Sequence, residues 1–178
     1  MRRSLELDPL SIAANVQLGL DLYLSRKYDQ AIEQYHKTLE MDANFPVGHL
    51  LLGMAYDQRA MYAPAIASLQ KAVSLFEGEP IATAMLTRAY AASGAQASTR
   101  ELLSELNRLR DHRYVSAYLF ALIHVGLGEK EQAWHWLERA IEERSAWLGD
   151  RVTVDPMLDP LRPDPRFATL LRRMNLAP

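Results

Sequence analysis

Large apolar residues return along this chain at a fixed step of 34 residues, and each is followed by a small residue. The repeated pairs are Leu18-Gly19, Leu52-Gly53, Leu86-Thr87 and Phe120-Ala121. A second column of small residues keeps the same step at Ala31, Ala65, Thr99 and Ala133. Apolar residues lie four positions beyond this second column, one turn along the same helical face. A period of this length indicates a helical hairpin copied along a solenoid.

The period predicts two helices in each unit. The first helices are expected at about 12–25, 46–59, 80–93 and 114–127, and the second at about 28–41, 62–76, 96–110 and 130–144. Pro46 and Pro80 suit the first turn of a helix, where the missing N–H does no harm. Gly94 and Gly128 lie between helices, where a positive φ favours glycine. Ser98 with Glu101 predicts a capping box that starts its helix slightly late. We find no alternation long enough to predict a strand.

The repeat register divides the chain into units and two flanking segments. The units are 12–45, 46–79, 80–113 (degenerate) and 114–147, with 1–11 before them and 148–178 after them. Residues 5–9 match the end of a preceding repeat, and half a hairpin cannot bury its own face. We therefore expect a fragment or divergent end of a longer protein, with a native N-terminal tail as the alternative. Residues 148–178 combine a Pro-rich, turn-rich stretch with a capping helix that Asp164 and Pro165 begin.

These columns resemble the tetratricopeptide repeat (TPR). The second unit matches best, with Leu52, Gly53, Tyr56, Ala65, Leu69 and Ala72. The fourth unit departs from the pattern, because His124 stands in the aromatic column. The resemblance implies an all-α, right-handed α-solenoid of helix-turn-helix hairpins with a C-terminal capping helix. Residues 154–174 further resemble the ends of TPR segments in bacterial signalling proteins (Ser/Thr kinases, adenylate cyclases and winged-helix regulators). This implies a sensory or scaffolding arm of a larger protein.

The composition and charge of the chain limit the partners and the compartment that we expect for it. The chain has 178 residues, of which 49% are hydrophobic, and a formal net charge of −2. This balance provides no broad field for nucleic acid or anionic membranes. Residues 114–128 are too short to span a membrane, and the N-terminus has Glu6 and Asp8 where a secretion signal would need an apolar run. We expect a cytoplasmic protein, or a periplasmic one if it belongs to a membrane-anchored regulator.

The sequence offers no motif for catalysis, and we expect a protein that is not an enzyme and has no cofactor. The five histidines have no metal-binding spacing, and cysteine is absent, so we expect no metal site. Trp134 and Trp136 either form an aromatic recognition patch or pack against a neighbouring hairpin or the cap, and packing is favoured. An enzyme with dispersed catalytic residues remains a remote alternative.

In TPR solenoids the first helices line the concave face, which implies which side chains point into a groove. The residues expected there are Val16, Leu20, Tyr23, Leu50, Met54, Asp57, Ala84, Arg88, Tyr118 and Leu122. Most are apolar, and an exposed apolar patch marks an interface. We therefore predict an open groove that binds an apolar or amphipathic peptide segment, with Asp57 and Arg88 orienting it. The alternative is a self-association module that forms a homodimer.

Overall fold

The computed structural model describes residues 11–149 and 151–176, and these residues form helices and short connections without a strand. The helices are α2 (Ile12–Leu24), α3 (Tyr28–Met41), α4 (Pro46–Gln58), α5 (Tyr62–Leu75), α6 (Pro80–Ser93), α7 (Gln96–Arg110), α8 (Ala117–Gly126), α9 (Lys130–Glu142), α10 (Arg151–Val154), the 3₁₀ helix η1 (Pro156–Leu161) and α11 (Pro165–Arg173). The predicted end of a preceding repeat lies, except for residue 11, outside the described residues.

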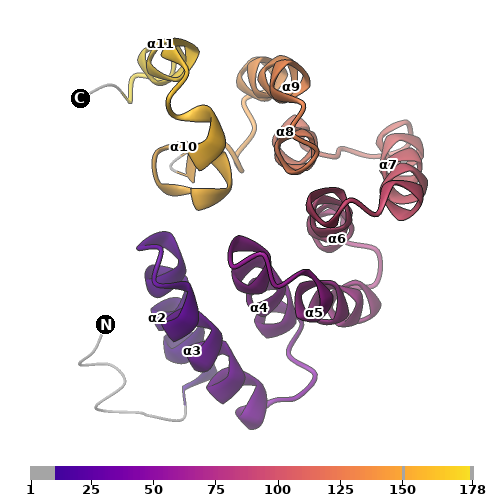
Figure 1. Cartoon of the computed structure of the whole chain (residues 1–178), viewed down its shortest axis with the longest axis vertical. Helices are drawn as coiled ribbons and strands as arrows, with labels where there is room; N and C mark the ends of the chain where they lie inside the picture. The colour runs from indigo at the N-terminus through magenta and orange to yellow at the C-terminus, as the bar shows by residue number, and fades with distance from the viewer. Residues whose placement is uncertain (1–10, 150, 177–178) are drawn as a thin grey trace.

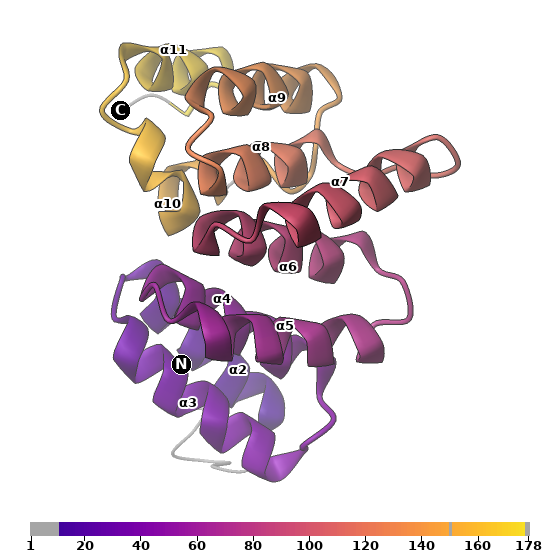
Figure 2. The same cartoon turned by 45° about the vertical axis from the view of Figure 1, so that its right-hand side comes forward.

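The helices stack as consecutive hairpins. The pairs α2–α3, α4–α5, α6–α7 and α8–α9 each pack together, and each pair contacts the next. Figure 2 shows these layers following one another from the bottom of the view to the top, with α11 as the last layer. The predicted all-α solenoid with a terminal helix is therefore confirmed.

The small residue after each large apolar one permits a close approach between two helices. A Cβ placed on Gly53 would lie 2.5 Å from Leu69 Cγ and 3.1 Å from the carbonyl oxygen of Ala65. A Cβ on Gly19 would collide with the ring of Tyr35. The 34-residue column thus marks the point where the two helices of a hairpin come closest.

The turn inside each hairpin repeats as strictly as the helices do. Arg26, Ala60, Gly94 and Gly128 follow one another at 34 residues and have φ angles of 61°, 55°, 81° and 75°. The left-handed region favours glycine, so the predicted role of Gly94 and Gly128 is confirmed. Arg26 and Ala60 adopt the same turn with a Cβ, at a cost of about 1–2 kcal/mol each.

Two helix starts differ from the sequence prediction. The capping box at Ser98 is wrong: α7 begins at Gln96, and Thr99 Oγ1 instead donates to the carbonyl oxygen of Ala95 at 2.9 Å. Helix α8 begins at Ala117 rather than near 114, because Ser116 Oγ accepts a hydrogen bond from the Tyr118 amide at 3.2 Å. At α8 a local side-chain hydrogen bond thus marks the boundary, whereas α7 begins after Ala95 without a side-chain cap.

Candidate functional site: the concave face and the segment that covers it

The first helix of each hairpin lies on the inner side of the solenoid. In Figure 1, α4, α6 and α8 lie inside α5, α7 and α9. The inner helices α4, α6 and α8 are buried around most of their circumference, and α8 is buried continuously from Ala117 to Ile123, whereas α2 buries only Asn15, Gly19 and Tyr23. The outer helices are amphipathic, and α9 buries only Ala133, Trp134, Leu137 and Ala140. A helix that is apolar all round needs neighbours on every side, so the inner face must itself be covered.

Most residues predicted to line the groove are buried. Tyr23, Leu50, Met54, Asp57, Ala84, Arg88, Tyr118 and Leu122 are each less than 9% exposed. Val16 and Leu20 are half-buried against the core. The prediction of a vacant, open groove is therefore wrong. The adjacent helices cover part of this face, and the chain's own C-terminal region covers a further part.

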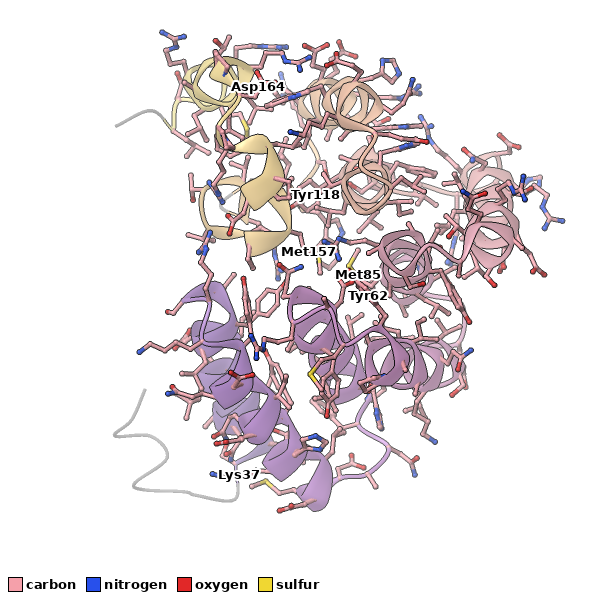
Figure 3. All side chains as sticks on the ribbon, in the orientation of Figure 1. Lys37, Tyr62, Met85, Tyr118, Met157 and Asp164 are labelled. Carbon is pink, nitrogen blue, oxygen red and sulfur yellow. The ribbon has the colours of Figure 1, made fainter. Side chains whose placement is uncertain are left out.

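We call Arg151–Leu161, which comprises α10 and η1, the closing segment. Its apolar side chains Val152, Met157, Leu158 and Leu161 are at most 1% exposed. Its 3₁₀ helix packs on α8, and Figure 1 shows the segment between α8 and α2. Figure 3 labels Met157 and Tyr118 in this interior region. A segment of the chain itself therefore packs on the concave side.

A buried aspartate joins the closing segment to α8. Tyr118 Oη donates to Asp155 Oδ2 at 2.6 Å, and Asp155 Oδ1 accepts from the Met157 amide at 2.9 Å. Asp155 is 4% exposed. Burial raises the pKa of Tyr118 well above its ordinary value, and the charge of Asp155 raises it further. Tyr118 is therefore held protonated as a hydrogen-bond donor to the carboxylate.

An ion pair between α4 and α6 lies beside this contact. Arg88 Nη1 pairs with Asp57 Oδ2, and the two side chains are 9% and 3% exposed. Burial lowers the pKa of Arg88, whereas nearby Tyr23, Asp155 and Tyr118 raise it. Among the described residues, Arg88 Nε and Tyr23 Oη are buried without a hydrogen-bond partner. The structure thus brings Asp57 and Arg88 together as a buried pair, in which Asp57 Oδ1 is also without a hydrogen-bond partner among the described residues.

A second polar contact ties the closing segment to the first hairpin. Arg26 Nε and Nη2 donate to the two carboxylate oxygens of Asp159 at 2.8 and 2.7 Å. Arg162 Nε donates to Asp159 Oδ1 at 2.7 Å. Burial raises the pKa of Asp159, but the hydrogen bonds from Arg26 and Arg162 outweigh it and leave the pKa below its ordinary value. Since Arg26 ends the α2 region, this contact closes the arc between the first and last hairpins.

Sequence reasoning missed the closing segment as part of the site. It predicted a helix start at Asp164-Pro165, but it interpreted Asp155-Pro156 only as a turn signal, although that pair also fits a helix start with Asp as the cap and Pro in the first turn. Asp155 caps η1 in this way, and Asp164 caps α11, where its side chain accepts from the Arg166 amide at 2.9 Å. The apolar residues after Asp155-Pro156 were the signal that this stretch has a buried face.

Trp134 and Trp136 pack within the fold, as the favoured prediction held. Trp134 meets Phe167 of α11 edge to face, with ring centroids 6.4 Å apart. Trp136 stacks on Phe120 at 4.5 Å between centroids. The C-terminal helix therefore covers the last hairpin through aromatic contacts.

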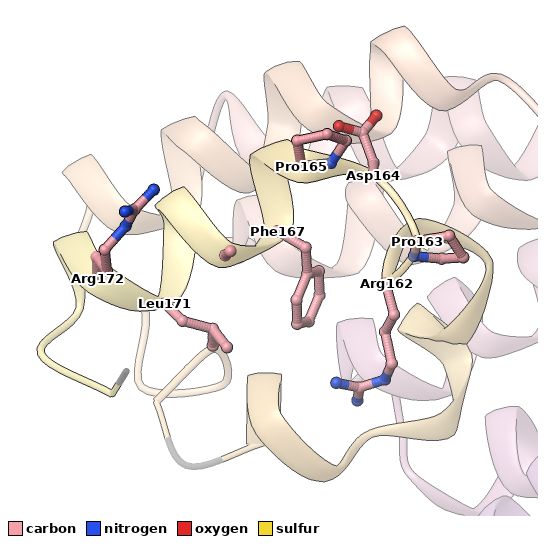
Figure 4. Close-up of a pocket in the computed structure, with 8 residues that line it drawn as sticks. Arg162, Pro163, Asp164, Pro165, Phe167, Leu171 and Arg172 are labelled. Atoms are coloured by element: carbon pink, nitrogen blue, oxygen red, sulfur yellow. The ribbon is translucent and has the colours of Figure 1, made fainter. Parts of the chain in front are cut away.

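A surface hollow lies outside the concave face, beside α11. A pocket of about 500 Å³ is lined by residues from Arg162 to Arg172, including Phe167 and Leu171. Figure 4 shows Phe167 and Leu171 projecting from α11 toward the side where the Arg162 guanidinium lies. A smaller pocket of about 190 Å³ includes the exposed aromatics Tyr114 and Trp147.

Within the described ranges, no group of three or more His, Cys, Asp or Glu side chains is placed to hold a metal ion. Every helix in the same ranges is too short or too polar to cross a membrane.

Comparison with known proteins agrees with this architecture. Residues 48–78 match the family model described as "Tetratricopeptide repeat". No curated protein matches the chain significantly in sequence. In structure the chain is similar to YrrB, described as "a TPR protein with an unusual peptide-binding site". The TM-score is 0.56 at 15% sequence identity, over 97% of this chain and 89% of that one. Residues 48–78 are thus similar to a tetratricopeptide repeat, and the chain has the fold of a tetratricopeptide-repeat solenoid.

Proposed function

We propose that this chain is a non-catalytic protein-interaction scaffold whose concave face binds an apolar or amphipathic peptide segment. The residues that make up this binding surface are those predicted from the first helices, joined by the contacts of the closing segment. A partner peptide would take the place that the closing segment occupies, or share it.

The observation that carries the proposal is the closing segment itself. It is a short, mostly apolar stretch that buries Val152, Met157, Leu158 and Leu161 against the solenoid. A peptide of the same chemistry from a partner would meet the same surface, since burial of apolar area is non-directional. The described peptide-binding site of YrrB supports the same kind of function, because the two proteins share the solenoid fold.

The test is peptide binding to the full chain with its closing segment loosened. Leu158→Glu places a charge at a position with 0% exposure and is expected to release the segment. Two labelled probes are titrated by fluorescence anisotropy: a copy of residues 151–162, and an amphipathic apolar helix without acidic residues. Saturable binding of either probe supports the proposal.

The half-buried Leu20 supplies the site-specific control. Leu20→Glu in the same chain is expected to weaken binding, and the matched Leu20→Met change is expected to leave it within about threefold. If Leu158→Glu unfolds the protein by circular dichroism, Arg26→Ala is the milder opening variant. A folded, opened chain that binds neither probe contradicts the proposal.

A further inference from the structure

The centre of the concave side contains buried polar side chains from several inner helices. Arg88 and Tyr23 are 7% and 1% exposed, and Arg88 Nε and Tyr23 Oη are unbonded among the described residues. The hydroxyl of Tyr118, also buried, donates to a residue of the closing segment and to no inner helix. A recess that presents donors in a buried setting favours an acceptor, and a carboxylate most of all.

The charges around the recess support the same assignment. Asp57 already pairs with Arg88 from the neighbouring helix, so the helices alone form a neutral pair. Asp155 then adds the one carboxylate that comes from outside the repeats. Burial raises the pKa of Tyr23 and Tyr118, and the charge of Asp155 raises both further, while the same charge opposes the lowering of the Arg88 pKa by burial. Of the three groups, Tyr118 hydrogen-bonds the incoming acid, and Arg88 and Tyr23 lie in its surroundings.

Asp155 is held in a defined backbone conformation at the start of η1. Asp155 caps η1 through the Met157 amide, and Pro156 occupies the first position of that helix. Met157 and Leu158 follow directly and are buried. The unit that enters the recess is thus Asp-Pro followed by two apolar residues. A second Asp-Pro pair in the same segment, at Asp159, lies at the surface with its side chain 37% exposed and faces Arg26 instead.

We infer that Tyr118 and the buried groups around it form a recess that recognises an aspartate side chain through the Tyr118 hydroxyl, and that the preferred partner is an apolar peptide segment containing Asp-Pro followed by apolar residues. The closing segment supplies this ligand from within the chain, so a partner competes with it for the recess. This inference rests on the proposed function, because it specifies the peptide that the concave face prefers.

The test compares the two aspartates of one peptide. The probe copies residues 151–162, with Asn in place of either Asp155 or Asp159, and binds the full chain carrying Leu158→Glu. Asn at the Asp155 position is expected to weaken binding about 10- to 100-fold, because it removes a charge-assisted acceptor from buried donors. Asn at the Asp159 position is the matched control, with an expected loss below about threefold, because that carboxylate forms a surface pair.

A receptor variant locates the effect. Tyr118→Phe keeps the ring and removes the donor, so it is expected to reduce the preference for Asp over Asn at the Asp155 position several-fold. Hydrogen exchange on the unmutated full chain provides a second readout that does not depend on Leu158→Glu folding. Excess Asp-containing peptide is expected to raise exchange in residues 151–161, and the peptide with Asn at the Asp155 position is expected to raise it less.

The outcomes separate the two proposals. If both Asn peptides bind as tightly as the parent, the aspartate recess is wrong while the peptide-binding scaffold stands. If Tyr118→Phe leaves the preference unchanged, the recess is also wrong. If neither the Asp-Pro peptide nor the acid-free amphipathic helix binds the opened chain, the proposed function itself fails.

Discussion

The stacked hairpins and the closing segment are both well buried, yet different contacts hold them. In the hairpins, apolar columns repeat every 34 residues, and Gly53 lies against Leu69 as Gly19 lies against Tyr35. In the closing segment, buried apolar side chains are joined by polar contacts that occur once, with Arg26 and Asp159 separated by 133 residues in sequence. Repeated apolar burial distributes the stability of the hairpins over neighbouring units. The attachment of the closing segment depends instead on a small number of contacts. We therefore expect the closing segment to open while the hairpins remain folded.

The strongest test of this comparison is the buried pair inside the hairpin stack. Arg88→Met leaves Asp57 buried without its partner, and we expect a loss of about 3–5 kcal/mol in the free energy of unfolding. The double change Arg88→Met with Asp57→Leu is the control. It removes both charges and is expected to recover most of the loss. Urea denaturation followed by circular dichroism measures both. A mild effect of the single change would mean that the pair contributes little to holding α4 and α6 together.

Two matched leucines test the two regions directly. Leu69 in α5 and Leu158 in η1 are 1% and 0% exposed. Leu69→Ala is expected to lower the global free energy of unfolding by about 2–5 kcal/mol. The reason is that the surrounding hairpin core cannot collapse to fill the cavity left by the removed side chain. Leu158→Ala is expected to lower it less, because the closing segment can open by itself and limit the loss. Hydrogen exchange should show faster exchange confined to residues 151–161 in Leu158→Ala. Equal global losses would mean that the closing segment unfolds together with the hairpins.

The repeated turn offers a smaller effect confined to the hairpins. Ala60 has a φ of 55°, so Ala60→Gly is expected to stabilise the protein by about 0.5–1 kcal/mol after the entropic cost of glycine. Gly94, with a φ of 81°, occupies the equivalent turn, and Gly94→Ala is expected to destabilise by about 1–2 kcal/mol. Thermal unfolding measures the pair of variants. The two variants must change the stability in opposite directions. Hydrogen exchange in residues 151–161 should not change in Ala60→Gly.

Acid is expected to loosen the closing segment with the smallest effect on overall stability. The pKa of Asp159 is lower in the folded chain than its unfolded value of about 3.9. Its ion pair therefore contributes fully above about pH 4, and the contribution is lost as the pH falls through the folded pKa. Because the pair is partly exposed, we expect about 0–1 kcal/mol. Exchange in residues 151–161, measured from pH 6 downward, should rise before the hairpins lose helicity. Asp159→Asn should remove this part of the pH dependence.

The hairpin core could be predicted because its contacts follow the repeat. Ala31, Ala65, Thr99 and Ala133 were expected at close helix contacts, and all are buried. Each packs within its own hairpin or against the next, so the pattern that encodes the helix also encodes its neighbour. The starts of α7 and α8 were less predictable, because competing hydroxyl groups near a helix end offer alternative local hydrogen bonds.

The candidate site could be predicted only in part. The first helices were identified as the concave side, and Asp57 and Arg88 were singled out within it. Their burial was not foreseen, because the sequence pattern of an inner helix is the same whether its free face meets solvent or another segment. Asp155 was interpreted as a turn residue, since its contact with Tyr118 lies outside the 34-residue register.

By itself the sequence determined that this chain is a stack of helical hairpins, because the 34-residue period repeats the same packing between adjacent elements. Only the tertiary structure decided that the concave side is occupied. That outcome depends on residues 26 and 159 meeting across the arc, and their contact belongs to no repeat. The physical reason is that periodic patterns report contacts between neighbours, whereas closure depends on where the accumulated curvature of the whole solenoid brings its two ends.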